Sequence, residues 1–500
     1  MTLACVQSRA LLGLAAPAVT VEVHLANGLP SLSLGGLADV EVKEARERVR
    51  CALQNSGLEF PNNKRITVNL APADLPKDSG RFDLPIALGI LAASGQIPLE
   101  ALHGWAFAGE LSLSGALRPV RGGLVSSLHG GDQRLVLPLD SAREAALAPA
   151  AQVFGAAHLL DVVAHLLGQP GGEGWQRITA QAPVHRASGP DLADVKGQVQ
   201  AKRALEIAAA GGHGLLLVGP PGAGKSMLAQ RFSSLLPAMT EQEALESAAV
   251  ASLAGRFDPQ EWGLRPTSAP HHTASAVALV GGGSPPRPGA ISLAHHGVLF
   301  LDEFPEFARS ALEALREPLE NGHITIARAA LSSQFPARFQ LLAAMNPCPC
   351  GFHGSTQRPC RCSPQQIGRY QGKLSGPLLD RIDLHVHVPA LPAQELLQAP
   401  TGESSAAIRQ RVVQARQRAV ARQGGANQQL HGQQLEAVLQ LEPAAHALLH
   451  KAAERLAWSA RATHRTLRVA RTIADLAGGE GIASAHVAEA IQYRNVLLKN

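Results

Sequence analysis

The sequence predicts an α/β core with a parallel sheet, preceded by an α+β domain and followed by a helical domain. Three observations support this prediction. Strand-like and helix-like segments alternate from residue 191 to about residue 390. A glycine-rich turn at residues 219–226 separates an apolar strand from a helix. After Pro389 no strand-like run occurs, so the last part of the chain is expected to be helical.

Composition indicates a folded chain of several domains. Its 500 residues are 46% hydrophobic and 17% charged, which argues against long disordered segments. A net charge of +5 is compatible with nucleic-acid binding without requiring it. The apolar stretch Ala10–Val19 could be the core of a signal peptide, but such a core follows a positively charged segment, and no Lys or Arg precedes Arg9. We therefore interpret this stretch as part of the first strands of a domain. No apolar run of about 18 residues predicts a membrane span, so we expect a cytoplasmic protein.

The domain boundaries follow from breaks in the pattern. We predict an N-terminal domain at 1–167, a linker at 168–190, an α/β core at 191–390 and a helical domain at 391–500. The linker begins at a run of glycine and proline, residues 168–174. The elements that we expect are strands at 19–25, 214–218, 298–301 and 340–345, and helices at 160–167, 202–210, from about 225, 405–422 and 444–477.

The glycine-rich turn is a complete phosphate-binding loop. It consists of Gly219, Pro220, Pro221, Gly222, Ala223, Gly224, Lys225 and Ser226. The glycines allow backbone N–H groups to point inward at a helix N-terminus, where anions are stabilised. Lys225 is expected to reach the β- and γ-phosphates of ATP, and Ser226 to bind Mg²⁺.

Two later strands end in polar residues at the same edge of the sheet. Asp302 and Glu303 follow the strand 298–301, and Asn346 follows the strand 340–345. Asp302 is expected to hold Mg²⁺, Glu303 to act as general base on the attacking water, and Asn346 to contact that water or the γ-phosphate as a sensor. The alternative for the acidic pair is a helix cap.

Arg381 lies in the segment Leu378–Asp383, between two aspartates. If it follows the last strand of the core, it cannot reach the phosphates of its own subunit but can reach those of a neighbour. Such an arginine finger predicts a ring of subunits. The alternative is a surface salt bridge.

Four of the six cysteines fall within fifteen positions. Cys348 and Cys350 form one C-x-C pair, Cys360 and Cys362 form another, and nine residues separate the pairs. Four thiolates can close around one tetrahedral ion, and zinc is the expected occupant of this structural site. His353 can replace one thiolate. The alternative is a set of reduced or redox-active thiols.

Together these residues resemble the Mg-chelatase-like AAA+ ATPases of the ComM type over nearly the whole chain. The distinctive motifs are the segments 270–275, 281–283, 288–297 and 346–351. The resemblance implies an AAA+ P-loop NTPase core with a helix-2 insert, a hairpin before sensor 1 and a four-cysteine loop at 346–363, followed by a helical lid. It also assigns residues 459–461 to the start of the sensor-2 helix, so that Arg461 would contact the γ-phosphate from the lid, with Arg465 and Arg468 as the alternatives.

The resemblance further implies an ATP-dependent hexameric ring that acts as a DNA helicase in branch migration during natural transformation or homologous recombination. Its partners would be single-stranded or branched DNA, further copies of the same chain and recombination proteins. The insert at 271–289 and the hairpin at 324–339 would face the pore, where Arg287 and Arg328 are candidates for phosphate contacts. A solvated surface loop is the alternative for both arginines.

The N-terminal part resembles the Lon-protease-like domain, which has the ribosomal S5 domain 2-like fold. The position of its nucleophilic serine holds Asp83, and that of its lysine holds Val125. Neither residue can take part in Ser–Lys hydrolysis, so we expect a proteolytically inactive assembly or binding module. A shifted alignment would bring Ser79 to the nucleophile position.

Other signals are weaker, and two functions remain open. The arginines at 409, 411, 416, 418 and 422 lie on one predicted helix, where a solvated face or a subunit contact is favoured over DNA. The histidine pairs 271–272 and 295–296 are expected to form hydrogen bonds to backbone or phosphate rather than bind metal. A DNA motor is the leading hypothesis. A chelatase-type ATPase that remodels a protein partner is the alternative.

Overall fold

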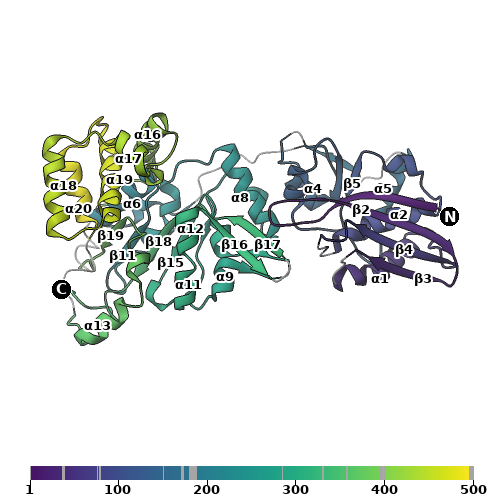
Figure 1. Cartoon of the computed structure of the whole chain (residues 1–500), viewed down its shortest axis with the longest axis horizontal. Coiled ribbons are helices and arrows are strands. Elements are labelled where there is room, and N and C mark those ends of the chain that lie inside the picture. Colours follow the sequence, from purple (N-terminus) through teal and green to yellow (C-terminus); the bar gives the residue numbers. More distant parts are fainter. Residues whose placement is uncertain are drawn as a thin grey trace.

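A computed structural model gives the fold for residues 2–36, 40–75, 77, 80–149, 151–169, 174–179, 189–283, 285–328, 331–355, 358–392, 398 and 400–494. The molecule is elongated, with the N-terminal sheet at one end, the parallel sheet in the middle and the C-terminal helices at the other end (Figure 1). Among these residues, none of the helices combines the length and apolar character needed to span a lipid bilayer.

The N-terminal part is an eight-stranded mixed sheet covered by helices. The strand order is β10-β9-β8-β5-β1-β2-β4-β3. Strand β2 alternates between buried and partly exposed residues, which is the pattern of a sheet with one face on a core. The strands are β1 (Thr2–Arg9), β2 (Ala18–Asn27), β3 (Ser31–Gly35), β4 (Lys64–Ala71), β5 (Trp105–Phe107), β8 (Arg134–Pro138), β9 (Val153–Ala156) and β10 (Gln176–Ile178), with the short pair β6 (Glu110–Leu111) and β7 (Leu117–Arg118). The helices are α1 (Val40–Asn55), α2 (Asp83–Ala93), α3 (Gly123–Leu128), α4 (Leu139–Ala145) and α5 (Leu159–Leu166).

The middle part contains a five-stranded sheet in the order β12-β15-β18-β11-β19, with every neighbouring pair parallel. Its strands β11 and β15 are fully buried and consist of apolar residues, as expected for a sheet with helices on both faces. The strands are β11 (Leu215–Val218), β12 (Thr267–Ser268), β15 (Val298–Leu301), β18 (Gln340–Met345) and β19 (Leu384–His387). The helices are α6 (Val199–Gly211), α7 (Lys225–Gln230), α8 (Glu241–Leu253), α9 (Ala276–Val280), α10 (Ala290–Leu293), α11 (Arg309–Glu313), α12 (Arg316–Asn321), α13 (Pro364–Gln371) and α14 (Gly376–Leu379). The predicted α/β class and the parallel sheet are confirmed.

Two small antiparallel pairs precede β15 and β18 in the chain. One is β13 (Gly281–Gly282) with β14 (Arg287–Pro288), within the predicted insert. The other is the hairpin of β16 (His323–Arg328) and β17 (Leu331–Pro336), which precedes β18. The two pairs pack together, since a Cβ atom on Gly281 would lie 2.8 Å from the side chain of Ile326.

The last part of the chain is helical, as predicted. It comprises α16 (Ser405–Gln423), α17 (Gly432–Val438), α18 (Pro443–Arg455), α19 (Ala460–Ala477) and α20 (Ser484–Gln492). Apolar residues of α16 and α19 share one hydrophobic core with α6 and β11, so these helices are packed on one face of the parallel sheet.

Two predicted segments differ in the structure. The helix predicted over 444–477 is interrupted at 456–459, where Ala457 has a φ of 47°. Ser459 caps α19 through a hydrogen bond from the N–H of Ala462, at the helix start that the family resemblance implied. Part of the predicted linker is the strand β10, which pairs with β9. Trp175, just before β10, stacks on His165 at 4.1 Å between ring centroids, and this contact holds the segment on the N-terminal sheet.

The N-terminal part touches the core through α3, α4 and α8. The N–H of Gly122 donates to the carbonyl of Ser252 at 3.1 Å. One carboxylate oxygen of Glu144 accepts hydrogen bonds from the N–H of Gly123 at 2.8 Å and from the hydroxyl of Ser252 at 3.0 Å. Glu144 therefore joins α4 to α8 across the boundary.

Candidate nucleotide site and cysteine cluster

The carboxyl ends of β11, β15 and β18 meet at one edge of the parallel sheet, because the three strands are neighbours and run in the same direction. A cavity of about 600 Å³ opens at this edge. It is lined by Pro221, Gly222, Ala223, Gly224, Lys225, Ser226, Met227, Ala269, Pro270, His271, His272, Phe300, Asp302, Glu303, Met345 and Asn346. The structure thus brings together the phosphate loop, the acidic pair and the sensor candidate.

Lys225 is the first residue of α7 and its side chain is largely buried. It donates to the carbonyls of Gly219 at 2.7 Å and Pro220 at 2.9 Å, and to the amide oxygen of Asn346 at 3.1 Å. Burial lowers the pKa of Lys225, and the nearby carboxylate of Asp302 partly offsets this effect. The loop therefore holds a desolvated cation that an anionic ligand would stabilise.

The acidic pair follows β15 directly. The hydroxyl of Ser226 donates to Asp302 at 2.7 Å, so the two residues expected to hold Mg²⁺ are in contact. The other carboxylate oxygen of Asp302 accepts from the N–H of Glu303 at 2.9 Å. Glu303 has a φ of 51° and precedes a 3₁₀ turn without capping it through its side chain. Its carboxylate does not serve as the helix cap considered as an alternative.

Two contacts at this site were not predicted from the sequence. His272 contacts Glu303, with 2.7 Å between Nδ1 and a carboxylate oxygen. Gln198 donates to the carbonyls of Ala223 at 3.1 Å and Pro389 at 2.7 Å, which ties the phosphate loop to the end of β19. Both contacts join segments far apart in sequence. His272 was expected to form a hydrogen bond to backbone or phosphate, and its partner in the structure is a carboxylate. For Gln198 the local signal was a polar residue just before an apolar helix.

Arg381 and Arg461 lie together, away from the cavity. Arg381 donates to the carbonyl of Pro377 at 2.7 Å and contacts Glu320 on α12. Arg461 approaches the same carboxylate at 3.9 Å and is 69% exposed. Neither arginine is among the described residues that line the cavity. Arg381 precedes β19, so it does not follow the last strand of the core as the sequence argument supposed.

The alternative sensor-2 residues have other partners. Arg465 lies 3.6 Å from Asp383, and Arg468 donates to the carbonyl of Gln428 at 2.6 Å. Neither lines the cavity among the described residues. The roles of all three lid arginines stay predictions.

The arginines considered for DNA contact fall into two groups. Arg287 is exposed on β14, and Arg328 ends β16, opposite Leu331. On α16, four of the five arginines contact other residues of the same chain. Arg411 contacts Glu206 and Glu403. Arg416 donates to the carbonyls of Ala209 and Ala210, and both Arg418 and Arg422 contact Asp475. This favours the structural interpretation of that helix.

The second histidine pair belongs to a hydrogen-bonded cluster. The Nε2 atoms of His295 and His296 lie 3.4 Å and 2.7 Å from one carboxylate oxygen of Glu246. The Nδ1 atom of His295 accepts from the N–H of Arg338 at 3.1 Å, so its ring proton is on Nε2. Burial lowers the pKa of His295 to about 4, which keeps it neutral. With Nε2 protonated, His295 donates to Glu246 and has no free lone pair for a metal at that atom.

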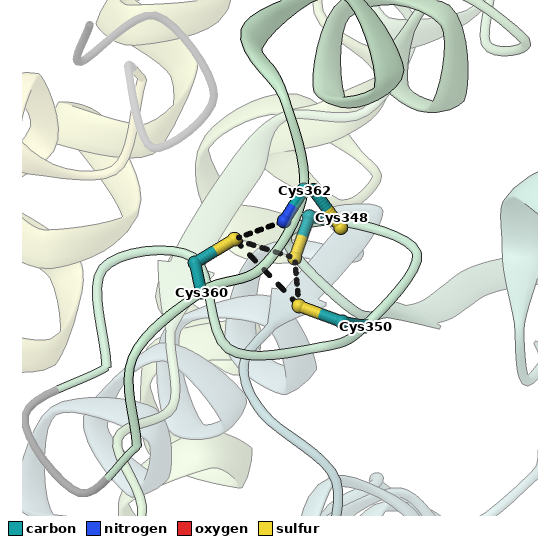
Figure 2. Close-up of side chains that lie close together, drawn as sticks. All are labelled: Cys348, Cys350, Cys360 and Cys362. Atoms are coloured by element: carbon teal, nitrogen blue, oxygen red, sulfur yellow. Dashed lines mark hydrogen bonds between the residues drawn. The ribbon is translucent and has the colours of Figure 1, made fainter.

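The four clustered cysteines come together as predicted (Figure 2). The Sγ atom of Cys348 lies 3.4 Å from that of Cys350 and 3.7 Å from that of Cys360, and Cys350 and Cys360 are 3.6 Å apart. All four sulfur atoms lie within 4.8 Å of one another. The N–H of His353 donates to Cys348, but among the described residues the group of close ligand atoms contains only the four thiols.

Asp83 and Val125 of the N-terminal part are both buried. Arg48 binds both carboxylate oxygens of Asp83, at 2.8 and 3.2 Å, and the N–H of Leu111 donates to one of them. Burial raises the pKa of Asp83 to about 6, against the opposing effect of Arg48. Asp83 is therefore an internal ion-pair residue. Ser79 lies outside the described residues.

Three family descriptions match the chain: subunit ChlI of Mg-chelatase at residues 21–140, magnesium chelatase subunit ChlI at 191–396, and its C-terminal part at 402–494. The chain is 50% identical to the competence protein ComM of Haemophilus influenzae over 500 residues, which covers 99% of this chain and 98% of the relative. It is 48% identical to the uncharacterized protein YifB of Salmonella typhimurium over the same shares of both chains. A partial match, 30% identical over 27% of this chain and 14% of the relative, is to the maternal DNA replication licensing factor mcm3 of Xenopus laevis.

These matches span both the N-terminal part and the core that carries the phosphate loop, the acidic pair and Asn346. The chain therefore belongs to the magnesium chelatase ChlI family of AAA+ proteins, as a member of its ComM type.

Proposed function

We propose that this protein is an ATPase that couples ATP hydrolysis to the movement of DNA, as a helicase in branch migration. The observation that carries the ATPase proposal is the joining of Lys225 to Asn346 and of Ser226 to Asp302 at the edge of the parallel sheet. This arrangement supplies a cation for the phosphates and two oxygen ligands for Mg²⁺.

In this proposal Glu303 acts as the general base and Asn346 orients the attacking water or the γ-phosphate. Glu303 lies on the cavity wall next to Asp302, so its carboxylate can take a proton from water there. Lys225 exchanges its contacts with loop carbonyls for contacts with phosphate oxygens. ATP, with Mg²⁺ at Ser226 and Asp302, is the ligand that we assign.

We further propose a homo-hexameric ring in which Arg381 and Arg461 serve the site of the neighbouring subunit. Both arginines approach Glu320, and neither lines the cavity of its own chain among the described residues. Two cations that share one carboxylate can leave it for the phosphates of an adjacent subunit, where they would stabilise the charge of the transition state.

The DNA assignment rests on two small antiparallel pairs and on the relatives. The pairs β13–β14 and β16–β17 pack against each other, and they carry Arg287 and Arg328, which we propose as phosphate contacts. The name of one relative refers to competence and that of another to DNA replication. Recombination proteins are further proposed partners, and the cytoplasm is the proposed location.

A chelatase-type ATPase that remodels a protein partner is the second candidate. It is favoured by the family descriptions, which refer to magnesium chelatase in all three parts of the chain. We also propose that Cys348, Cys350, Cys360 and Cys362 hold a structural zinc ion, because four thiolates leave no open position for a substrate.

The deciding experiment measures ATP turnover with no DNA, with single-stranded DNA and with a labelled four-way junction, together with unwinding of that junction. The helicase proposal predicts faster turnover with DNA and ATP-dependent separation of the strands. Turnover that DNA does not change, without strand separation, would remove the helicase proposal and leave the protein remodeller.

A further inference from the structure

The cysteine cluster touches the phosphate loop through Gly351. This residue follows Cys350 and has a φ of 85°. A Cβ atom added there would lie 2.5 Å from Cδ and 2.8 Å from Cγ of Pro221. The atoms of a proline ring cannot swing aside as the end of a flexible side chain can. The backbone of Gly351 is therefore packed directly on the phosphate loop.

The sulfur geometry fits one tetrahedral ion. A zinc–sulfur bond of about 2.3 Å places the sulfurs of a tetrahedral site about 3.8 Å apart. The three separations among Cys348, Cys350 and Cys360, at 3.4, 3.6 and 3.7 Å, are close to this value. The sulfur of Cys362 lies within 4.8 Å of each of these three. A disulfide needs about 2.0 Å, so these thiols are spaced for a common ion rather than for a sulfur–sulfur bond.

Backbone N–H groups surround the sulfurs. The N–H of His353 donates to Cys348 at 3.3 Å, and that of Cys362 donates to Cys360 at 3.4 Å. The N–H groups of Phe352 and Arg361 donate to Cys350. Such donors stabilise thiolate charge and orient metal ligands, and apolar packing of four reduced cysteines does not require them.

The cluster also joins two elements of the core. Cys348 follows Asn346, which accepts a hydrogen bond from Lys225. Cys362 precedes Ser363, which caps α13. At the end of α13, the side chain of Gln371 donates to the carbonyl of Pro347 at 3.0 Å. An ion at the four sulfurs would close the loop between β18 and α13 at the point where it meets the nucleotide site.

We propose that the zinc ion held by the four cysteines sets the position of Gly351 against Pro221, and that nucleotide binding at the phosphate loop depends on this ion. The metal takes no part in the chemistry. It fixes the loop that carries Asn346 at one end and supports the phosphate loop in its middle. This inference rests on the proposed ATP site, but the metal site itself can be tested without ATP.

The first experiment uses the full chain. Elemental analysis is expected to find one zinc ion per chain. A zinc-selective chelator is then expected to raise the Kd of a fluorescent ATP analogue by about tenfold. This Kd is measured with Mg²⁺ in excess. Adding zinc back restores the original Kd. Circular dichroism before and after chelation shows whether the fold persists, since general unfolding would raise the Kd for another reason.

Two glycine variants test the contact between Gly351 and Pro221 without removing the metal. Gly351 and Gly354 both have left-handed backbones, with φ of 85° and 74°, but a Cβ on Gly354 would meet nothing within 4 Å. Gly351→Ala is therefore expected to keep the zinc and raise the Kd about tenfold by displacing Pro221. Gly354→Ala carries the same kind of backbone strain and is expected to keep both the zinc and the Kd.

The outcomes are distinct. Zinc-free protein with an unchanged Kd, or a Gly351→Ala variant that binds the analogue as tightly as Gly354→Ala, would overturn the coupling. A chain that contains no zinc and takes none up would overturn the metal site. If the protein holds zinc but never binds the analogue, the proposed ATP site has failed and the metal site stands.

Discussion

The two charged residues at the centre of the site, Lys225 and Glu303, have separable roles. Lys225 is held by loop carbonyls and Asn346, where a phosphate would replace those contacts. We expect Lys225→Ala to weaken ATP binding by about 100-fold, because two or more charge-assisted hydrogen bonds are lost. Glu303→Gln keeps the shape and removes the proposed base, so kcat should fall about 10²- to 10⁴-fold with binding intact.

Isothermal titration measures the binding of ATP to both variants, and steady-state assays measure turnover. Glu303→Gln should also accumulate bound ATP in a single-turnover experiment. A Glu303→Gln variant that turns over ATP at the normal rate would show that another group is the base.

His272 adds a second prediction at the residue scale. It contacts one carboxylate oxygen of Glu303 at 2.7 Å, and it belongs to the insert that we propose to meet DNA. A carboxylate held by this contact is less free to turn toward an attacking water, so His272→Ala is expected to raise basal ATP turnover about threefold without changing KM, and to reduce the stimulation by DNA.

The control is His271→Ala. His271 also lines the cavity, but its side chain pairs with the hydroxyl of Thr273. Basal turnover in the His271 variant should stay at the wild-type level. Equal effects of both substitutions on turnover would mean that the contact with Glu303 does not restrain the base.

The site residues that the sequence could predict share one property. Each of them comes after a buried apolar strand, so parallel pairing brings them to one edge. Asp302 and Asn346 follow their strands directly, and the phosphate loop after β11 ends in Lys225 and Ser226. His272 does not follow a strand of that kind, and its contact with Glu303 depends on how the insert folds back. A contact of this sort has no periodic pattern that could predict it.

At the scale of elements, the contact between α4 and α8 is expected to depend on pH. Burial raises the pKa of Glu144 to about 7, although the hydrogen bonds from Ser252 and Gly123 oppose this. An unfolded glutamate has a pKa of about 4.5. Between these two pKa values, folded Glu144 keeps a proton that the unfolded chain has released. The stability that this proton contributes is fully present below pH 4.5 and is lost as the pH rises through about 7.

Glu144→Gln removes the titration and keeps an oxygen that can accept both hydrogen bonds. At pH 8 the variant should be more stable than the wild type by on the order of 1–3 kcal/mol, and at pH 5 the difference should be small. Urea unfolding at the two pH values measures this. A difference in stability that is the same at both pH values would show that Glu144 is not the titrating group.

Elements with strong patterns were predicted within three residues at each end, and those that depend on distant partners were not. The strands 298–301 and 340–345 occur as predicted, because each is a continuous apolar run. The strand β10 is short and polar, and it is held by the stacking of Trp175 on His165. The apolar pattern alone missed the break between α18 and α19, because Ser459 can occur within a helix as well as cap one. The family resemblance did place the start of a helix at Ser459, and this residue caps α19.

At the scale of the whole molecule, the residues that we propose for the site are divided between the cavity and a contact outside its lining. The phosphate loop and the acidic pair line the cavity, and Arg381 and Arg461 meet at Glu320 outside it. In a ring, the two arginines of each subunit can contact the nucleotide site of the next subunit. Because such head-to-tail contacts repeat around the ring, every site would receive both arginines.

Mixing two inactive variants tests this arrangement. Lys225→Ala and Arg381→Ala should each be inactive alone. In an equimolar mixture, a boundary is active when the intact Lys225 of one subunit faces the intact Arg381 of its neighbour, so activity should recover to about one quarter of the wild type for random assembly.

A second mixture combines Lys225→Ala with Arg461→Ala. It tests whether Arg461 also acts across the boundary, as its place beside Arg381 suggests. If Arg461 instead serves its own site, that second mixture stays inactive while the first recovers, because no chain in it then combines intact Lys225 with intact Arg461. Recovery in neither mixture, with assembly confirmed by light scattering, would contradict the shared site.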